Sequence, residues 1–257
     1  MKFMKSLFFP LILIVLLTSG CNKEEELVPR TFDDVEEDFS EIPLSSGVQD
    51  VALELTEGVF WHFRMVPPSV LTSSLQPLVL ALHGASGGDN GAHLGTECLI
   101  EPGLESINPY ILSPNAGTTE WFDPENQEKL ATLMFLAKKY WPVDPDKVVI
   151  TGYSNGGNAS WFYSEHQSNS FSAGIPLASS YHSNTNIKIN TPLYVIHGED
   201  DELFPVDSTQ KWVEEYIDSG GDIQFVIADT LSHFRPCDYV PYLQGAATWL
   251  NDEVWNK

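Results

Sequence analysis

A serine between two glycines constrains this chain more than any other feature of its sequence. The stretch Gly152-Tyr153-Ser154-Asn155-Gly156 follows an apolar run at 147–151, which is typical of a strand buried on both faces. A helix is expected directly after it, from 156 to about 166. A serine in such a tight strand-to-helix turn needs glycine neighbours, because side chains at the flanking positions would clash. The turn lifts the hydroxyl above the edge of a sheet and directs the helix N-terminus toward it. Ser154 is therefore the predicted nucleophile.

The remaining patterns predict an α/β fold with one domain over 48–257. Strand and helix patterns alternate after an initial pair of strands, which implies a mostly parallel central sheet flanked by helices on both faces. The expected strands cover 48–57, 59–65, 77–82, 110–113, 147–151, part of 171–178, 191–196 and 223–228, and the expected helices cover 126–140, 156–166, 206–219 and 242–251.

A glycine-rich turn follows the apolar strand at 77–82. It reads Leu82-His83-Gly84-Ala85-Ser86-Gly87-Gly88, and such a turn lets backbone N–H groups face a reacting carbonyl. Two backbone N–H groups, those of Ala85 and Asn155, are the predicted oxyanion hole, and each preorganised donor contributes about 3 kcal/mol in the transition state.

A candidate acid and a candidate base come later in the chain. Asp201 lies between His197-Gly198 and Phe204-Pro205, just after the strand at 191–196, with Asp200 and Glu199 as neighbouring alternatives. His233 follows the last predicted strand. The order Ser154, Asp201, His233 selects this histidine from the seven in the chain. His197 is expected to be structural.

These four elements together resemble the α/β-hydrolase superfamily over roughly 50–257. Residues 143–148 and 154–157 are similar to small bacterial esterases of the phospholipase/carboxylesterase and poly-hydroxyalkanoate-depolymerase-like groups. The resemblance implies the α/β-hydrolase fold and a serine carboxylic ester hydrolase, which forms an acyl-enzyme without metal or cofactor. Expected substrates are extracellular esters or glycan esters. Two alternatives stay open: a serine peptidase of the prolyl-oligopeptidase type, and a non-catalytic surface binding lipoprotein.

Three further residues have two interpretations each. Trp121 follows a predicted strand end, so it either binds substrate or packs in the core. Cys98 and Cys237 either form a disulfide near the site or stay unpaired.

The N-terminus predicts export and a lipid anchor. Residues 1–20 combine Lys2 and Lys5 with an apolar run and small residues, as secretory signal peptides do. The stretch Leu17-Thr18-Ser19-Gly20-Cys21 resembles a bacterial lipobox, although Thr18 stands where that motif usually has Leu. An ordinary signal peptide is the alternative. The resemblance implies acylation of Cys21 and anchoring in the outer membrane, and the acidic run after Cys21 resembles a signal for exposure on the surface. Residues 21–47 are expected to form a flexible acidic tether.

The charge of the chain argues against nucleic-acid partners. The formal net charge is −23 at pH 7, and phosphate backbones repel such a surface. The oligomeric state cannot be read from the sequence.

Overall fold

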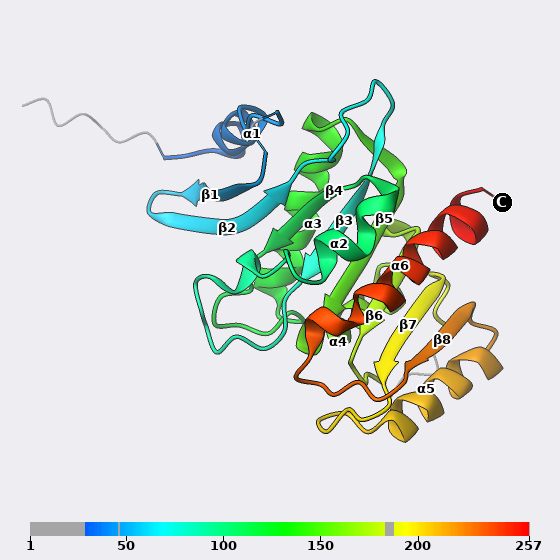
Figure 1. Cartoon of the computed structure of the whole chain (residues 1–257). Helices are drawn as coiled ribbons and strands as arrows, with labels where there is room; N and C mark the ends of the chain where they lie inside the picture. Colours follow the sequence, from blue (N-terminus) through cyan, green and yellow to red (C-terminus); the bar gives the residue numbers. More distant parts are fainter. Residues whose placement is uncertain (1–28, 46, 183–187, 257) are drawn as a thin grey trace, which may run out of the picture.

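An eight-stranded sheet forms the centre of the protein, as seen in a computed structural model that describes residues 29–45, 47–182 and 188–256 (Figure 1). The strand order is β1-β2-β4-β3-β5-β6-β7-β8. Strands β1 and β2, and β2 and β4, pair antiparallel, and all other neighbours pair parallel. The strands are β1 (Gln49–Thr56), β2 (Val59–Val66), β3 (Gln76–Leu82), β4 (Tyr110–Pro114), β5 (Val143–Tyr153), β6 (Ala173–Leu177), β7 (Leu193–Gly198) and β8 (Ile223–Ala228).

Burial along the strands follows their place in the sheet. Every residue of β4 and β6 is buried, as in parallel strands covered on both faces. The outer strand β2 alternates between exposed and buried positions over much of its length, so only one of its faces packs on the core. The continuous apolar runs and the alternating runs of the sequence thus correspond to central and outer strands.

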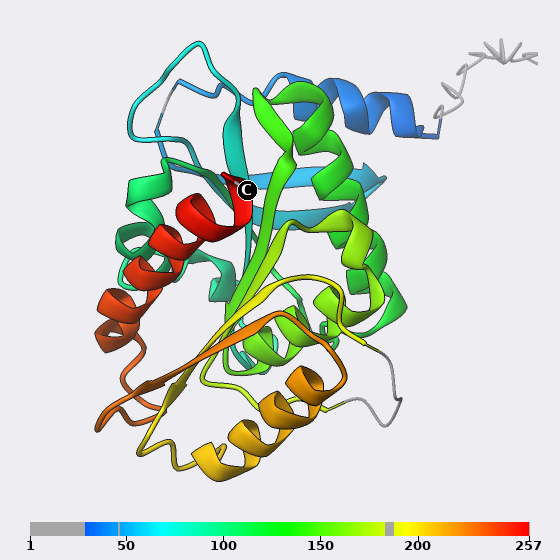
Figure 2. The ribbon, with the colours of Figure 1, turned by 90° about the vertical axis from the view of Figure 1, so that its right-hand side faces the viewer.

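Helices cover both faces of the sheet, which confirms the predicted fold class (Figure 2). One apolar core joins α3 and α4 to the sheet, and a second joins α2 and α6 to its other face. Helix α5 packs through a third cluster with α4 and β7. The helices are α1 (Phe32–Ser40), α2 (Ile100–Leu104), α3 (Pro124–Tyr140), α4 (Asn155–His166), α5 (Val206–Asp218) and α6 (Val240–Trp249), with short helical turns at η1 (Ala92–Leu94), η2 (Glu105–Ile107), η3 (Ser168–Ser170), η4 (Pro236–Tyr239) and η5 (Leu250–Trp255).

The N-terminal part of the chain differs from the expected tether. Helix α1 lies within 21–47 and buries Val35 and Phe39, which stand four residues apart on one face of the helix. The ring of Phe39 stacks on Trp141 at 5.2 Å and on Phe63 at 6.0 Å between centroids. Because most residues of this helix are acidic, its two buried apolar residues do not form a recognisable helical pattern in the sequence. The remainder of the predicted tether at 21–28, the signal peptide at 1–20 and the anchor at Cys21 lie outside the described residues.

Among the described helices, none combines the length and the apolar character needed to cross a membrane.

We expect Phe39→Ala to lower the free energy of unfolding by about 3 kcal/mol, because it removes a fully buried ring and leaves a cavity. Phe32→Ala, at a half-exposed position of the same helix, is the matched control and should change it by less than about 1 kcal/mol. Urea unfolding of both variants measures the difference. Equal, small losses would mean that α1 is not part of the folded body.

Candidate active site

Ser154 sits in a strained turn between β5 and α4. Its backbone has φ 57° and ψ −119°, a conformation that non-glycine residues rarely adopt. Its N–H donates to the carbonyl of Leu177 at 3.0 Å, which ties the turn to β6. A side chain at Gly156 would begin only 2.0 Å from the carbonyl oxygen of Leu82. The second glycine of the pattern is therefore required by contact between α4 and β3.

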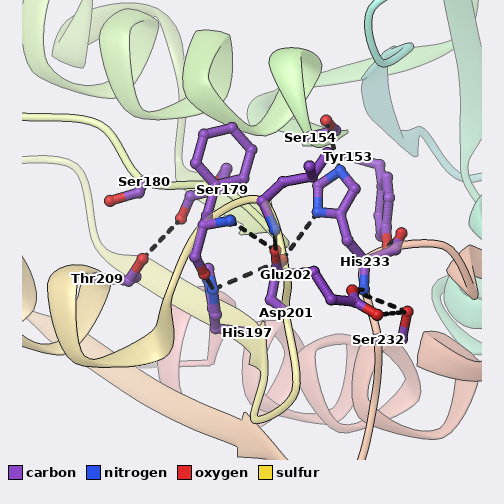
Figure 3. A network of polar contacts seen from close by, with 12 residues as sticks. Tyr153, Ser154, Ser179, Ser180, His197, Asp201, Glu202, Thr209, Ser232 and His233 are labelled. Carbon is purple, nitrogen blue, oxygen red and sulfur yellow. Dashed lines mark hydrogen bonds and ion pairs between the residues drawn. The ribbon is translucent and has the colours of Figure 1, made fainter.

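The side chains of Ser154, His233 and Asp201 form one hydrogen-bonded chain (Figure 3). Ser154 Oγ lies 2.9 Å from His233 Nε2, and His233 Nδ1 lies 2.8 Å from Asp201 Oδ2. Since an ionised carboxylate only accepts, Nδ1 carries the proton and Nε2 is free to accept from the serine hydroxyl. His233 and Asp201 are both buried. The structure thus brings together the three residues that the sequence selected from the turns and loops after β5, β7 and β8.

Asp201, rather than Asp200 or Glu199, is the carboxylate that reaches the histidine. Its other oxygen, Oδ1, accepts from the backbone N–H groups of Leu203 at 2.9 Å and Phe204 at 2.7 Å. Burial raises the pKa of Asp201, but the hydrogen bonds from His233 and from the Phe204 backbone outweigh it and hold the pKa below its ordinary value. Asp201 therefore stays ionised at neutral pH.

Two residues that the sequence did not single out hold the backbone of the His233 loop. Glu202 accepts from the N–H of His233 at 3.0 Å and from the hydroxyl of Ser232 at 2.9 Å. The Tyr153 hydroxyl donates to the carbonyl of His233 at 2.5 Å. Glu202 is hidden in the sequence among four consecutive acidic residues, and Tyr153 occupies the variable position of the glycine-flanked serine motif. No pattern distinguishes either one.

His197 supports Asp201 from the opposite side and has the structural role expected of it. Its Nε2 donates to the carbonyl of Phe204 at 2.7 Å and lies 3.7 Å from Asp201 Oδ2. The side chain is fully buried, and this burial lowers its pKa although the bond to Phe204 acts in the other direction. A neutral His197 therefore fixes the turn that carries the carboxylate.

The predicted oxyanion donors Ala85 and Asn155 line one small cavity of about 100 Å³. Asn155 is the first residue of α4, so its N–H has no partner within the helix. Gly84 brings the β3 loop close to the nucleophile: a methyl group there would lie 3.4 Å from Ser154 Cβ. Both predicted residues thus lie beside Ser154 with backbone groups that can face a reacting carbonyl.

A half-buried histidine, His83, holds this loop in place. His83 Nδ1 lies 2.7 Å from the carbonyl of Gly84, and its Nε2 accepts from the N–H of Ala116 at 3.1 Å. Because Nε2 accepts, Nδ1 must be the donor, so the ring is neutral. Burial lowers the pKa of His83.

Trp121 packs in the core, as one of its two interpretations has it, and it also lines the small cavity of Ala85 and Asn155. It is only 1% exposed, and its indole N–H donates to the carbonyl of His83 at 3.0 Å. Its ring packs against the His83 ring at 4.9 Å between centroids. An almost fully buried indole thus supports the loop of His83.

Cys98 and Cys237 form a disulfide, with 5.0 Å between their Cα atoms and a separation of 139 positions in the sequence. The bond links the segment before α2 to η4, four residues after His233. Within the described ranges, no three His, Cys, Asp or Glu side chains are grouped so that they could hold a metal ion.

The architecture and the nucleophile turn define the α/β-hydrolase fold, and solved structures share it. The first is a thermostable esterase, with a TM-score of 0.68 at 20% identity over 81% of this chain and 63% of the esterase, less than two thirds of its length. The second is the fluorophosphonate-binding serine hydrolase F of Staphylococcus aureus in its substrate-bound form, with a TM-score of 0.64 at 14% identity over 80% of this chain and 99% of that one. The third is the acylaminoacyl peptidase of Pyrococcus horikoshii, with a TM-score of 0.62 at 15% identity over 81% of this chain and 42% of that one.

Within this fold, residues 117–239 match the model of the Dienelactone hydrolase family. The matched stretch contains Ser154, Asp201 and His233. No curated protein sequence matches the chain.

We expect the unfolding temperature to fall as the pH is lowered from 7 to 5. The folded-state pKa values of His83 and His197 lie below the ordinary value of 6.5, so below that pH the unfolded chain binds protons that the folded chain does not. This contribution to stability is complete above pH 6.5 and is lost as the pH falls toward the folded-state values. Thermal unfolding across this range measures it.

His197→Gln keeps a donor near the Phe204 carbonyl but cannot be protonated, so its unfolding temperature should depend less on pH than that of the unchanged chain. His62→Gln, on the exposed side of β2, is the control and should keep the full dependence. The same steep dependence in His197→Gln would contradict the assignment.

Proposed function

We propose that this protein is a serine hydrolase that cleaves carboxylic esters through an acyl-enzyme. One observation carries the proposal: a serine in a strained strand-to-helix turn is hydrogen-bonded to a histidine that is oriented by a buried, ionised carboxylate. The α/β-hydrolase fold and the match of 117–239 to the Dienelactone hydrolase family support it.

The mechanism follows from this arrangement. His233 Nε2 takes the hydroxyl proton of Ser154 as Oγ attacks the ester carbonyl, and Asp201 stabilises the imidazolium that forms. The N–H groups of Ala85 and Asn155 bind the oxyanion. His233 returns the proton to the leaving alcohol, and water, activated by the same nitrogen, then releases the acid from Ser154. The reaction needs no cofactor.

A second candidate function is peptide hydrolysis, because the fold is also that of the acylaminoacyl peptidase of P. horikoshii. Amides and esters are cleaved through the same acyl-enzyme chemistry. Comparing p-nitrophenyl acetate with an N-acetyl-aminoacyl p-nitroanilide distinguishes the two functions. Faster turnover of the anilide would favour the peptidase.

We expect Ser154→Ala to abolish hydrolysis of p-nitrophenyl acetate, and Asp201→Asn to lower kcat by about 10³- to 10⁴-fold, because the amide no longer fixes the histidine tautomer. Asp200→Asn is the matched control, one residue away and outside the hydrogen-bonded chain, and should stay within a few-fold of the unchanged enzyme. Steady-state kinetics on the four proteins test this.

Two results would change the assignment. Turnover that survives in Ser154→Ala would exclude this serine as nucleophile. If neither ester nor anilide is cleaved and a fluorophosphonate probe fails to label Ser154, the protein is a non-catalytic surface binder.

The proposed location is the outer surface of the cell envelope, with a lipid on Cys21. The lipobox-like stretch 17–21 and the acidic run after it support this location, and several acyl chains give stable anchoring because each buried methylene contributes about 0.8 kcal/mol. A surface location favours esters carried on glycans or other polymers as substrates.

Labelling cells with a palmitate analogue tests the anchor. We expect label on the full chain and its loss in Cys21→Ser, which should move from the membrane fraction to the soluble exported fraction. A Cys21→Ser protein that stays in the membrane fraction would contradict acylation at this residue.

A further inference from the structure

A second cavity near Ser154 is mainly apolar, has a volume of about 210 Å³ and is lined by Tyr153 and by the loop of His83 and Gly84. It is enclosed by the end of β3, by η1 and α2, and by the loop after His233. Its apolar wall includes Leu82, Ala92, Leu99, Ile100 and Pro236. The smaller cavity beside Ala85 and Asn155 is lined mainly by glycine, threonine and serine residues, so the two spaces differ in chemistry as well as in size.

Two residues of the cavity lining, Tyr153 and Gly84, lie next to the nucleophile. Tyr153 directly precedes Ser154 and lines the cavity. Gly84 also lines it, and a methyl group on Gly84 would lie 3.4 Å from Ser154 Cβ. The cavity wall thus includes two residues adjacent to the nucleophile, which brings this space within reach of a substituent of an ester bound at Ser154.

Small residues keep the cavity open, and a covalent bond supports its wall. Glycine or alanine stands at 84, 92 and 95, where larger side chains would occupy the space. Cys98 belongs to the lining, and its disulfide to Cys237 joins the wall beside α2 to the loop that carries His233. The Tyr153 hydroxyl also donates a hydrogen bond to the backbone of this loop, at the carbonyl of His233. A space held open in this way is available to a ligand without rearrangement of the fold.

We propose that this cavity binds the hydrophobic group of the ester substrate, either a short alkyl chain or one aromatic ring. The proposal rests on the esterase function proposed above and names the class of substrate for that site. An apolar cavity of about 150 Å³ suffices to bind benzene, so 210 Å³ accommodates a ring with a small substituent. The hydrophobic group can belong to the acid or to the alcohol, and the experiment separates the two.

The experiment measures kcat/KM in two series of esters. The first varies the acid, from p-nitrophenyl acetate to octanoate, and the second varies the alcohol, from methyl to hexyl and benzyl acetate. In the series whose variable group enters the cavity, we expect kcat/KM to rise about fourfold per added methylene until the cavity is full, since each buried methylene contributes about 0.8 kcal/mol.

Two substitutions of the wall give opposite shifts. Ala92→Leu adds three carbon atoms at the wall and should flatten the dependence on chain length, whereas Ile100→Ala should move the optimum to chains longer by one or two methylenes. The matched control is Ala131→Leu on the exposed side of α3, which should keep the dependence of the unchanged enzyme. Because Ile100→Ala removes volume, it tests the proposal even if Ala92→Leu does not fold.

These outcomes distinguish the cavity proposal from the esterase function on which it rests. Hydrolysis that depends on Ser154 but rises with chain length in neither series, and that responds to neither wall substitution, would overturn the cavity assignment and leave the esterase function standing. Failure to hydrolyse any ester in either series would overturn the esterase function itself.

Discussion

The close contact between the start of α4 and the end of β3 is the constraint on which the rest of the site depends. The carbonyl oxygen of Leu82 occupies the space that a side chain at residue 156 would need. This contact allows β3 to pair beside β5 and still continue into the loop of Gly84, next to Ser154. The nucleophile and the loop of its predicted oxyanion donors are thus brought together by backbone atoms.

Hydrogen bonds to the backbone of His233 position this base as much as its carboxylate partner Asp201 does. The N–H of His233 is held by Glu202 and its carbonyl by Tyr153, so the peptide groups on both sides of the residue are fixed. Asp201 then has to orient only the ring. The four consecutive acidic residues 199–202 therefore do not compete for the histidine ring. Their carboxylates point in different directions, and only that of Asp201 reaches the imidazole.

The sequence predicts the sheet and the three central side chains because these depend on local patterns. Apolar runs of five to seven residues appear as buried strands, and the order of Ser154, Asp201 and His233 matches the order of strand ends at one edge of the sheet. Helix α1 escapes prediction because six polar or acidic positions surround its two buried residues. Glu202 and the cavity escape prediction for another reason: they depend on which loops meet across the sheet edge, and spacing along the chain contains no such information.

The two ends of β5 separate the N-terminal segment from the nucleophile. Helix α1 packs on Trp141, two residues before β5 begins, and Ser154 follows the residue at which β5 ends. Eleven residues of strand span about 35 Å. Only residues 22–29 lie between Cys21 and Arg30, which bonds Asp38 of α1. A lipid on Cys21, as proposed above, would therefore be joined to the folded part of the protein on the side where β5 begins, opposite to the end of the strand that leads into Ser154.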